Sequence, residues 1–233
     1  MNTRWWIGND IVDLAEPGVA GKERDRRFMD RVFTPAERAH ILDAAAPTIA
    51  LWKTWAAKET AFKIAGKLRE KVVFAHQAFE VHAESAGERA RVRFENLDIR
   101  VRWETALDYI HCIGQAAREG APGGGPGRLK GGEGAIDWRG LFARIVQEGQ
   151  SLDGVLSRAE QASVHSSASE RARLLARRLL DRWDLQGAEI VRLWRSWGWS
   201  PPVVAREGTP LAAFDVSLSH DGRFVAAAVV GPA

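Results

Sequence analysis

The sequence predicts an α+β protein made of two similar halves. Residues 119–134 divide the chain, because ten of these 16 residues are Gly or Pro and such a composition favours a flexible linker. Each half places a helix before a series of strands and ends in an apolar strand, at Tyr109–Ala116 and at Phe224–Val230. We therefore expect a first half at residues 1–118 and a second half at 135–233, in a pseudo-twofold arrangement with a site at the seam.

The first half begins with an expected strand at Arg4–Leu14, whose apolar run ends in polar residues. The charged segment Lys22–Asp43 is expected to be helical, with Thr34 as an N-cap and Pro35 at the first helical position. A second helix is expected at Ala50–Lys67. Alternating apolar and polar residues then predict strands at Ala78–Ala83, Arg89–Phe94, Asp98–Trp103 and Tyr109–Ala116.

The second half is expected to begin with a helix at Ala135–Val146, followed by a polar, Ser-rich stretch. Its clearest element is an amphipathic helix at Ser169–Trp183, in which leucines recur at helical spacing and Ser169 is the candidate N-cap. Short strands are expected at Ala188–Trp194, Asp215–Leu218 and Arg223–Val230.

The charge balance and the cysteine count exclude several classes of protein. The net charge is +3, since 33 Lys and Arg stand against 30 Asp and Glu, and this surplus is too small for a generally cationic nucleic-acid binder. The single cysteine, Cys112, excludes an intrachain disulfide and a cysteine-based metal cage. We expect no signal peptide, because Met1–Asp10 has no long apolar run, and no apolar stretch approaches the roughly 20 residues of a membrane helix. We expect a cytoplasmic protein.

The first candidate functional motif is Gly8–Leu14, which places Asp10 and Asp13 after an apolar strand. A carboxylate held rigidly at the end of a strand suits a hard cation such as Mg²⁺. The alternative is that these aspartates cap a turn.

The second candidate motif lies on the expected helix Ala50–Lys67, where Glu59 and Lys63 are four residues apart and share a face. One interpretation is an exposed ion pair, which contributes only about 0.3–0.5 kcal/mol. The neighbouring residues are apolar, however, and include Trp55 and Phe62. This setting also fits a charged pair at the edge of a cleft.

The third motif is the end of a strand at Ser217-Leu218-Ser219-His220-Asp221-Gly222. A histidine with adjacent hydroxyl and backbone donors can bind phosphate, and the alternative is a polar hairpin turn. A fourth feature is the segment 171–195, where seven Arg and three acidic residues give a local surplus of four positive charges. Arginine binds phosphate through two parallel hydrogen bonds, and the alternative is a solvated helix face.

In combination these motifs resemble the 4′-phosphopantetheinyl transferase superfamily. The family pattern is an apolar strand with G-x-D, a helix with W/F-x-x-K-E-x-x-x-K, and a strand that ends in S-H. This chain has Gly8-Asn9-Asp10, Trp55–Lys63 and Ser219-His220 in these places, and Arg27–Ala39 resembles the segment that follows the first strand. The resemblance covers most of both halves. It is to the fused pseudo-dimer type, with the halves in reversed order as in a circular permutation.

The resemblance implies an activity. The family transfers 4′-phosphopantetheine from coenzyme A to a serine of an acyl or peptidyl carrier protein, in fatty-acid, polyketide or nonribosomal peptide synthesis, and releases 3′,5′-ADP. By analogy, Asp10 and Glu59 would bind Mg²⁺ and Lys63 would contact the pyrophosphate. Lys63, Glu59 and a metal-bound water remain competing candidates for the base. Many fused members carry a second acid where this chain has Val12.

The resemblance also implies a binding site for coenzyme A. The residues expected to hold its phosphates are Ser219 and His220, with Lys58 and Lys67 as further candidates, and with Arg173, Arg177 and Arg178 as candidates for the 3′-phosphate. The first half lacks the Ser-His pair and the second half lacks the G-x-D and K-E motifs. One composite site per chain is therefore expected, in a monomer.

The carrier protein is expected to be acidic and to dock on Arg24, Arg26, Arg27 and Arg31, in the region that binds carriers in the small synthases. Two other functions remain as alternatives. One is a transferase-like protein that has lost activity and serves as a binding partner. The other is a single-stranded nucleic-acid-binding module, because the segment with Trp194, Trp197 and Trp199 mixes aromatic residues with Arg.

Overall fold

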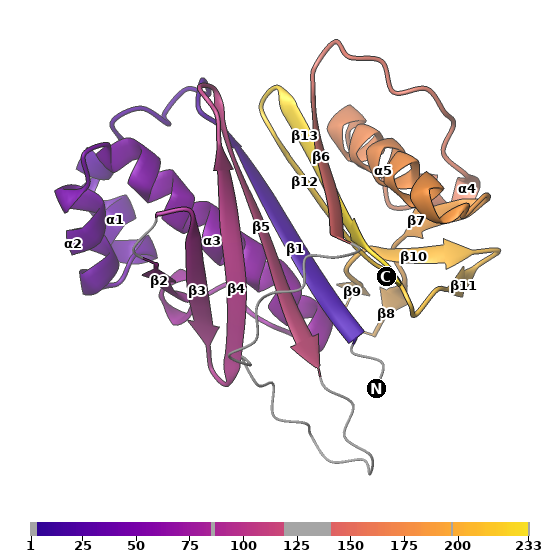
Figure 1. Cartoon of the computed structure of the whole chain (residues 1–233), viewed down its shortest axis with the longest axis horizontal. Coiled ribbons are helices and arrows are strands. Elements are labelled where there is room, and N and C mark those ends of the chain that lie inside the picture. Colours follow the sequence, from indigo (N-terminus) through magenta and orange to yellow (C-terminus); the bar gives the residue numbers. More distant parts are fainter. Residues whose placement is uncertain (1–3, 85–86, 119–140, 197, 233) are drawn as a thin grey trace.

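A computed structural model describes residues 4–84, 87–118, 141–196 and 198–232 of the chain (Figure 1). The expected Gly/Pro-rich linker at 119–134 and Trp197 lie outside these residues. Among the described residues, no helix combines the length and the apolar character that crossing a bilayer requires.

The first half is a five-stranded antiparallel sheet with helices packed on one face (Figure 1). The strand order is β1-β5-β4-β3-β2, and the long helix α3 contacts every strand of the sheet. The elements are β1 (Arg4–Asp13), η1 (Lys22–Arg24), α1 (Arg26–Val32), α2 (Pro35–Asp43), α3 (Pro47–Leu68), η2 (His76–Ala78), β2 (Glu80–Ala83), β3 (Arg89–Phe94), β4 (Leu97–Thr105) and β5 (Tyr109–Arg118).

The expected helical segment Lys22–Asp43 is divided into three pieces because side chains within it cap new helices. Asp25 accepts a hydrogen bond from the backbone of Phe28 and begins α1. Thr34 begins α2 through a reciprocal capping box with Glu37, so its expected role as N-cap is confirmed. Pro35 follows at the first helical position, where its missing N–H costs nothing.

Gly8 allows helix α3 to lie directly on strand β1. A Cβ atom at this position would stand 2.3 Å from the backbone oxygen of Thr60, far inside van der Waals contact. The close approach matters because β1 carries Asp10 and α3 carries Glu59 and Lys63.

The second half combines a three-stranded sheet, β12-β13-β6, with a second one, β11-β10-β7, and the helix α5 packs on both. Its elements are β6 (Leu141–Gln147), α4 (Arg158–Gln161), α5 (Ser167–Leu180), η3 (Asp181–Trp183), β7 (Ala188–Val191), β8 (Trp194–Arg195), β9 (Gly198–Trp199), β10 (Val203–Arg206), β11 (Thr209–Pro210), β12 (Asp215–Asp221) and β13 (Phe224–Val230).

Two expectations for this half were wrong. The helix expected over Ala135–Val146 is instead the strand β6 from Leu141 onward, and residues 135–140 lie outside the described part. Strand β6 pairs antiparallel with the apolar β13 along its whole length, so a partner distant in the sequence decides its conformation. The N-cap of α5 is Ser166, whose side chain accepts the backbone N–H of Ser169, the residue expected as the cap.

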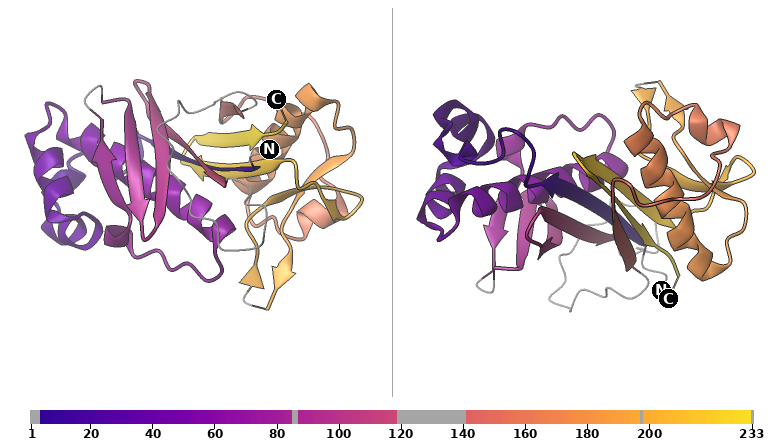
Figure 2. Two further views of the ribbon diagram at one scale, coloured as in Figure 1. Left: turned by 60° about the horizontal axis from the view of Figure 1, so that its bottom comes forward. Right: turned by 90° about the horizontal axis from the view of Figure 1, so that it is seen from above.

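The two halves share a simple pattern. In each, the first strand pairs antiparallel with the last, β1 with β5 and β6 with β13. In each, one long helix packs on these strands, α3 in the first half and α5 in the second. Figure 2 shows the two halves meeting along β1, β12 and β13.

A ladder of side chains joins the halves at this seam. The edge of β1 that does not face β5 offers backbone N–H groups at every second residue. Side-chain oxygens of β12, also at every second residue, accept them at 2.8–3.1 Å. The pairs are Ile7 with Asp215, Asn9 with Ser217, Ile11 with Ser219, and Asp13 with Asp221. The ladder satisfies an exposed strand edge and fixes the register between the halves.

Candidate functional site

Two neighbouring cavities lie at the seam between the halves. Their volumes are about 740 and 390 Å³. They share three lining residues, namely Lys63 of α3 with Leu218 and His220 of β12. Both cavities are therefore built from both halves of the chain.

The smaller cavity is acidic and is lined by Asp10, Glu59 and Asp221 together with Lys63. Asp10 is only 8% exposed. Its Oδ1 atom accepts hydrogen bonds from Lys63 Nζ at 2.9 Å and from Ser219 Oγ at 2.9 Å. The carboxylate is thus held by one residue from each half.

Glu59 is the unpartnered acid of this cavity. It accepts no hydrogen bond from any described residue, although it lies beside the buried face of α3. Burial, with the nearby charge of Asp10, raises the pKa of Glu59 to about 7, and Lys63 opposes that rise. Two carboxylates that repel one another in a half-buried pocket provide the oxygen ligands that Mg²⁺ prefers.

The donor set fits a magnesium ion that takes its remaining ligands from solvent and substrate. The described residues contain no cluster of three or more His, Cys, Asp or Glu side chains arranged to hold a metal by themselves. Mg²⁺ usually binds proteins through one or two carboxylates and keeps several waters or substrate phosphates. Asp10 and Glu59 are such a pair.

The larger cavity is strongly cationic. Its lining includes six basic side chains, and none of its described lining residues is acidic. The six are Lys63, Lys67, Arg69, Lys71, Arg173 and Arg192. Phe62, Val72 and Trp199 add apolar surface. Such a cavity suits a ligand that carries several phosphates and an apolar or aromatic part.

Arg173 is a buried cation in the wall of this cavity and has no acidic partner within ion-pair distance among the described residues. It is 2% exposed. Its terminal nitrogens donate to the backbone and hydroxyl oxygens of Ser169 and Ser163 at 2.6–3.1 Å, and its Nε has no partner in the described part of the chain. Burial and the charge of Arg192 lower the pKa of Arg173. A bound anion would offset both effects.

Two further expected residues line the larger cavity, Lys67 and His220. Lys67 Nζ donates to the backbone oxygens of Ile7 and Val216 and to Asp215 at 2.6–2.9 Å, so all three of its protons are engaged. Burial lowers the pKa of Lys67. Burial, followed by the charge of Lys63, likewise lowers the pKa of His220.

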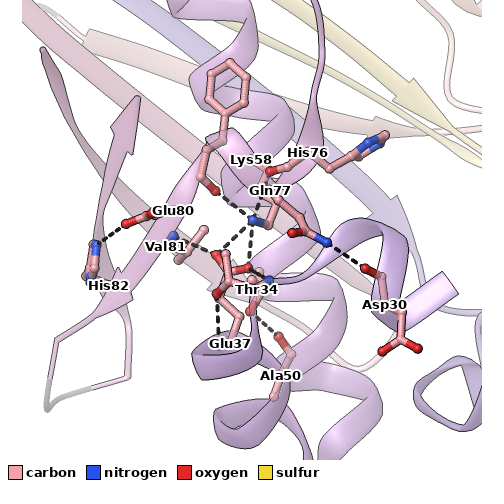
Figure 3. Close-up of polar contacts among 12 residues, drawn as sticks. Asp30, Thr34, Glu37, Ala50, Lys58, His76, Gln77, Glu80, Val81 and His82 are labelled. Atoms are coloured by element: carbon pink, nitrogen blue, oxygen red, sulfur yellow. Dashed lines mark hydrogen bonds and ion pairs between the residues drawn. The ribbon is translucent and has the colours of Figure 1, made fainter. Parts of the chain in front are cut away.

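Three of the expected coenzyme-binding residues line neither cavity. Lys58 is completely buried, and its ammonium group donates to Glu37 and to the backbone oxygens of His76 and Phe79 at 2.7–3.1 Å (Figure 3). Arg177 donates to the backbone oxygen of Val155 at 2.8 Å. Arg178 lies 3.6 Å from Asp153. Lys58 joins helices α2 and α3 to the turn before β2.

Asp13 is held away from the acidic cavity. It accepts two hydrogen bonds from the guanidinium group of Arg223, at 2.6 and 2.8 Å, and one from the backbone of Arg223. These bonds lower the pKa of Asp13 to about 2. Asp13 is three residues from Asp10 on a strand, so the two side chains lie on opposite faces of β1.

Sequence reasoning missed several residues of the larger cavity. Arg192 belongs to the Arg-rich segment but stands after its helix, and His165 lies in the polar stretch before α5. Arg69 and Lys71 follow the end of α3. No motif marks these positions. The signal they share is positive charge at the ends of elements that the fold brings to the seam.

Known proteins are similar to part of this chain. Residues 7–117 match the family model described as the 4′-phosphopantetheinyl transferase superfamily. A holo-[acyl-carrier-protein] synthase of Protochlamydia amoebophila is 37% identical over 60 residues, which are 26% of this chain and 49% of that protein. A second, of Rhodopseudomonas palustris, is 41% identical over 64 residues, 26% of this chain and 46% of that protein. The chain thus spans about half the length of these curated relatives.

Among solved structures, an ACPS–CoA complex from Chronobacterium ammoniagenes is 21% identical, with a TM-score of 0.40. The match covers 50% of this chain and 98% of that one. The matched residues 7–117 include Asp10, Glu59 and Lys63. The first half of the chain, which this family model covers, therefore matches the 4′-phosphopantetheinyl transferase superfamily.

Proposed function

We propose that the chain transfers the 4′-phosphopantetheine group of coenzyme A to a serine of an acyl or peptidyl carrier protein and releases 3′,5′-ADP. One observation carries this proposal above the others. A cationic cavity large enough for a nucleotide adjoins an acidic cavity with a Mg²⁺-type donor pair, and Lys63 and His220 line both. Transfer of a phosphoryl group from a diphosphate uses basic side chains that bind the phosphates and, beside them, carboxylates that hold a divalent cation.

Coenzyme A would occupy the larger cavity with its phosphates among the basic side chains. Arg173 and His220 would contribute to this binding, and Arg192 would join them, whereas Lys67, whose three protons are engaged within the chain, would contribute only its charge. Lys63 lies where the cavities meet and would place its charge beside the diphosphate. Lys58, Arg177 and Arg178 are left out of the proposed site because they line neither cavity.

Asp10 and Glu59 would hold Mg²⁺ in the smaller cavity. The ion would neutralise charge on the diphosphate during transfer. The serine hydroxyl passes its proton to a base, for which Glu59, Lys63 and a water are the candidates. Its oxygen forms a bond to the phosphorus that carries the pantetheine, and the bond from that phosphorus to the bridging oxygen breaks. The 3′,5′-ADP that leaves then carries additional negative charge, which Lys63 and the basic wall are placed to stabilise.

The site is composite. The proposed metal ligands lie on β1 and α3 of the first half, whereas His220 and Arg173 lie on β12 and α5 of the second. We infer a fused pseudo-dimer in permuted order, with one site per chain and therefore no need for a second copy. The paired strands and the single long helix of each half support this inference.

The carrier protein would dock on the basic residues of η1 and α1. Arg24 and Arg26 are almost fully exposed. Phe28 of α1 packs against Trp55, with ring centroids 5.7 Å apart, and Trp55 lines the smaller cavity. A carrier bound on α1 would therefore stand close to the cavity that receives its serine.

Intact mass spectrometry tests the proposed transfer. The chain is incubated with coenzyme A, Mg²⁺ and an apo carrier protein, with several acyl and peptidyl carriers tried in turn. We expect one phosphopantetheine to be added to the carrier. We expect no addition when the carrier serine is replaced by alanine, or with the Asp10→Ala and Glu59→Ala variants, whose folding is checked by circular dichroism.

Calorimetric titration with coenzyme A separates the alternatives. Binding without transfer to any carrier would contradict the proposed activity and favour a binding protein of transferase-like fold. Absence of both binding and transfer would contradict the assignment of the larger cavity as well.

A further inference from the structure

We propose that Ser219 is a positioning residue for the carboxylate of Asp10. It would act across the seam and set the orientation in which Asp10 meets a divalent cation. This inference rests on the proposed function, because it concerns the same metal site. It differs from the role that the family resemblance implies for Ser219, which is direct contact with coenzyme A.

The hydroxyl group of Ser219 is engaged both as a hydrogen-bond acceptor and as a hydrogen-bond donor. It accepts the backbone N–H of Ile11 at 3.1 Å and donates its single proton to Asp10 Oδ1 at 2.9 Å. Ser219 is 6% exposed. A serine has one proton to donate, so in this arrangement none remains for a phosphate.

The hydrogen bond from Ser219 holds one carboxylate oxygen of Asp10 and leaves the other open to a cation. Oδ1 accepts from both Ser219 and Lys63, whereas Oδ2 accepts no hydrogen bond from any described residue. Two donors on one oxygen restrain rotation of the carboxylate. Without Ser219, Lys63 alone would hold the carboxylate, and the Lys63 side chain is 27% exposed.

Ser219 belongs to the second half and Asp10 to the first, so their hydrogen bond depends on how the two halves pack against each other. Ser219 reaches Asp10 because the ladder places it opposite Ile11. A shift of β12 by two residues along β1 would bring another ladder residue to this place. The orientation of the Asp10 carboxylate therefore depends on how β12 lies against β1.

The ladder itself supplies a matched control. Ser217, two residues earlier on β12, accepts the backbone N–H of Asn9 at 2.9 Å, as Ser219 does for Ile11. Ser217 has no hydrogen bond to Asp10. Ser217→Ala and Ser219→Ala therefore each remove one acceptor for a strand N–H, but Ser219→Ala alone removes the contact with the carboxylate.

Binding of Mn²⁺, followed by the electron paramagnetic resonance of the free ion, tests the inference without reference to activity. The full chain is titrated with and without coenzyme A. We expect Ser219→Ala to bind Mn²⁺ about 10- to 100-fold more weakly than the wild type. We expect Ser217→Ala to bind within about twofold of the wild type, while urea midpoints fall similarly in both variants.

A second pair of variants guards against loss of folding in Ser219→Ala. Ser219→Thr and Ser219→Val fill nearly the same space, and only the Thr variant keeps the hydroxyl group. Tighter Mn²⁺ binding by Ser219→Thr, by about tenfold, would support the inference. Equal affinities in this pair, or a Ser219→Ala variant that binds like the wild type, would overturn it and leave the proposed function standing. A wild type that binds no Mn²⁺ in either condition would overturn the metal site itself.

Discussion

Lys58 and Glu37 form a completely buried ion pair, with Lys58 Nζ 2.8 Å from the carboxylate and side-chain exposures of 0% and 4%. The same carboxylate caps α2 and accepts the backbone N–H of Val81 at 2.8 Å. The pair therefore ties α2, α3 and β2 together. Lys58 immediately precedes Glu59, yet it serves the core, because neighbouring residues on a helix point about 100° apart.

Removal of the Lys58 ammonium group should destabilise the fold. We expect Lys58→Met to lower the free energy of unfolding by about 3–5 kcal/mol, because the buried carboxylate of Glu37 loses its counter-ion. Urea denaturation measures this loss. The double variant Lys58→Met/Glu37→Met should lose less than the sum of the single variants. A fully stable Lys58→Met protein with lost coenzyme A affinity would instead indicate that Lys58 contacts the coenzyme.

Substitution of Gly8 should separate α3 from β1. We expect Gly8→Ala to lower the free energy of unfolding by about 3 kcal/mol, since its Cβ would stand 2.3 Å from a backbone oxygen that cannot move alone. At Gly66 of α3, a Cβ would meet no described atom within 4 Å beyond the backbone of the helix itself. Gly66→Ala should therefore be neutral or stabilise the protein by up to about 1 kcal/mol. Similar effects of the two substitutions would contradict the close approach.

Two arginines of α5 should differ in their effect on coenzyme A. Arg173 lines the cationic cavity, whereas Arg178 lies beside Asp153 and lines neither cavity. We expect Arg173→Met to weaken coenzyme A binding about 10-fold or more, because a buried anion contact is lost. Arg178→Met should leave the affinity unchanged. Isothermal titration calorimetry measures the coenzyme A affinity of both variants. Equal affinities in the two variants would show that Arg173 is not part of the site.

Asp13 should make the stability of the protein depend on pH in acid. Its pKa of about 2 lies below the value of roughly 3.9 in an unfolded chain. The ion pair with Arg223 therefore stabilises the fold fully above about pH 4–5, and this stabilisation disappears as the pH falls through 2. We expect Asp13→Asn to cost about 1–2 kcal/mol at pH 7, after allowance for solvent screening at Arg223. Urea denaturation at several pH values would show whether the two proteins converge near pH 2.

The basic residues before α2 should affect the carrier protein and not the coenzyme. We expect Arg24→Glu/Arg27→Glu to raise the KM for carrier protein several-fold, with a stronger effect at low ionic strength, because an acidic partner would be repelled. The KM for coenzyme A should stay constant. An unchanged KM for carrier would place the docking surface elsewhere.

Local sequence patterns predicted most elements of the first half, where side-chain caps mark α1 and α2 and alternation marks several strands. Strand β3 has the expected bounds, Arg89–Phe94. The spacing of Glu59 and Lys63 also predicted a shared face, and the structure places both at the acidic cavity. The partnership of Ser219 with Asp10 was beyond such reasoning, because it joins residues 209 positions apart. The strand β6 was missed for the same reason.

The larger cavity draws its walls from both halves, with Phe62 and Lys67 from one side and Arg173 and Leu218 from the other. Whatever fills this cavity touches both halves at once. By thermodynamic linkage, occupancy of the cavity and association of the halves must strengthen each other by equal amounts of free energy. Bound coenzyme A would then stabilise the association of the two halves, and saturation with it should raise the midpoint temperature of thermal unfolding of the whole chain.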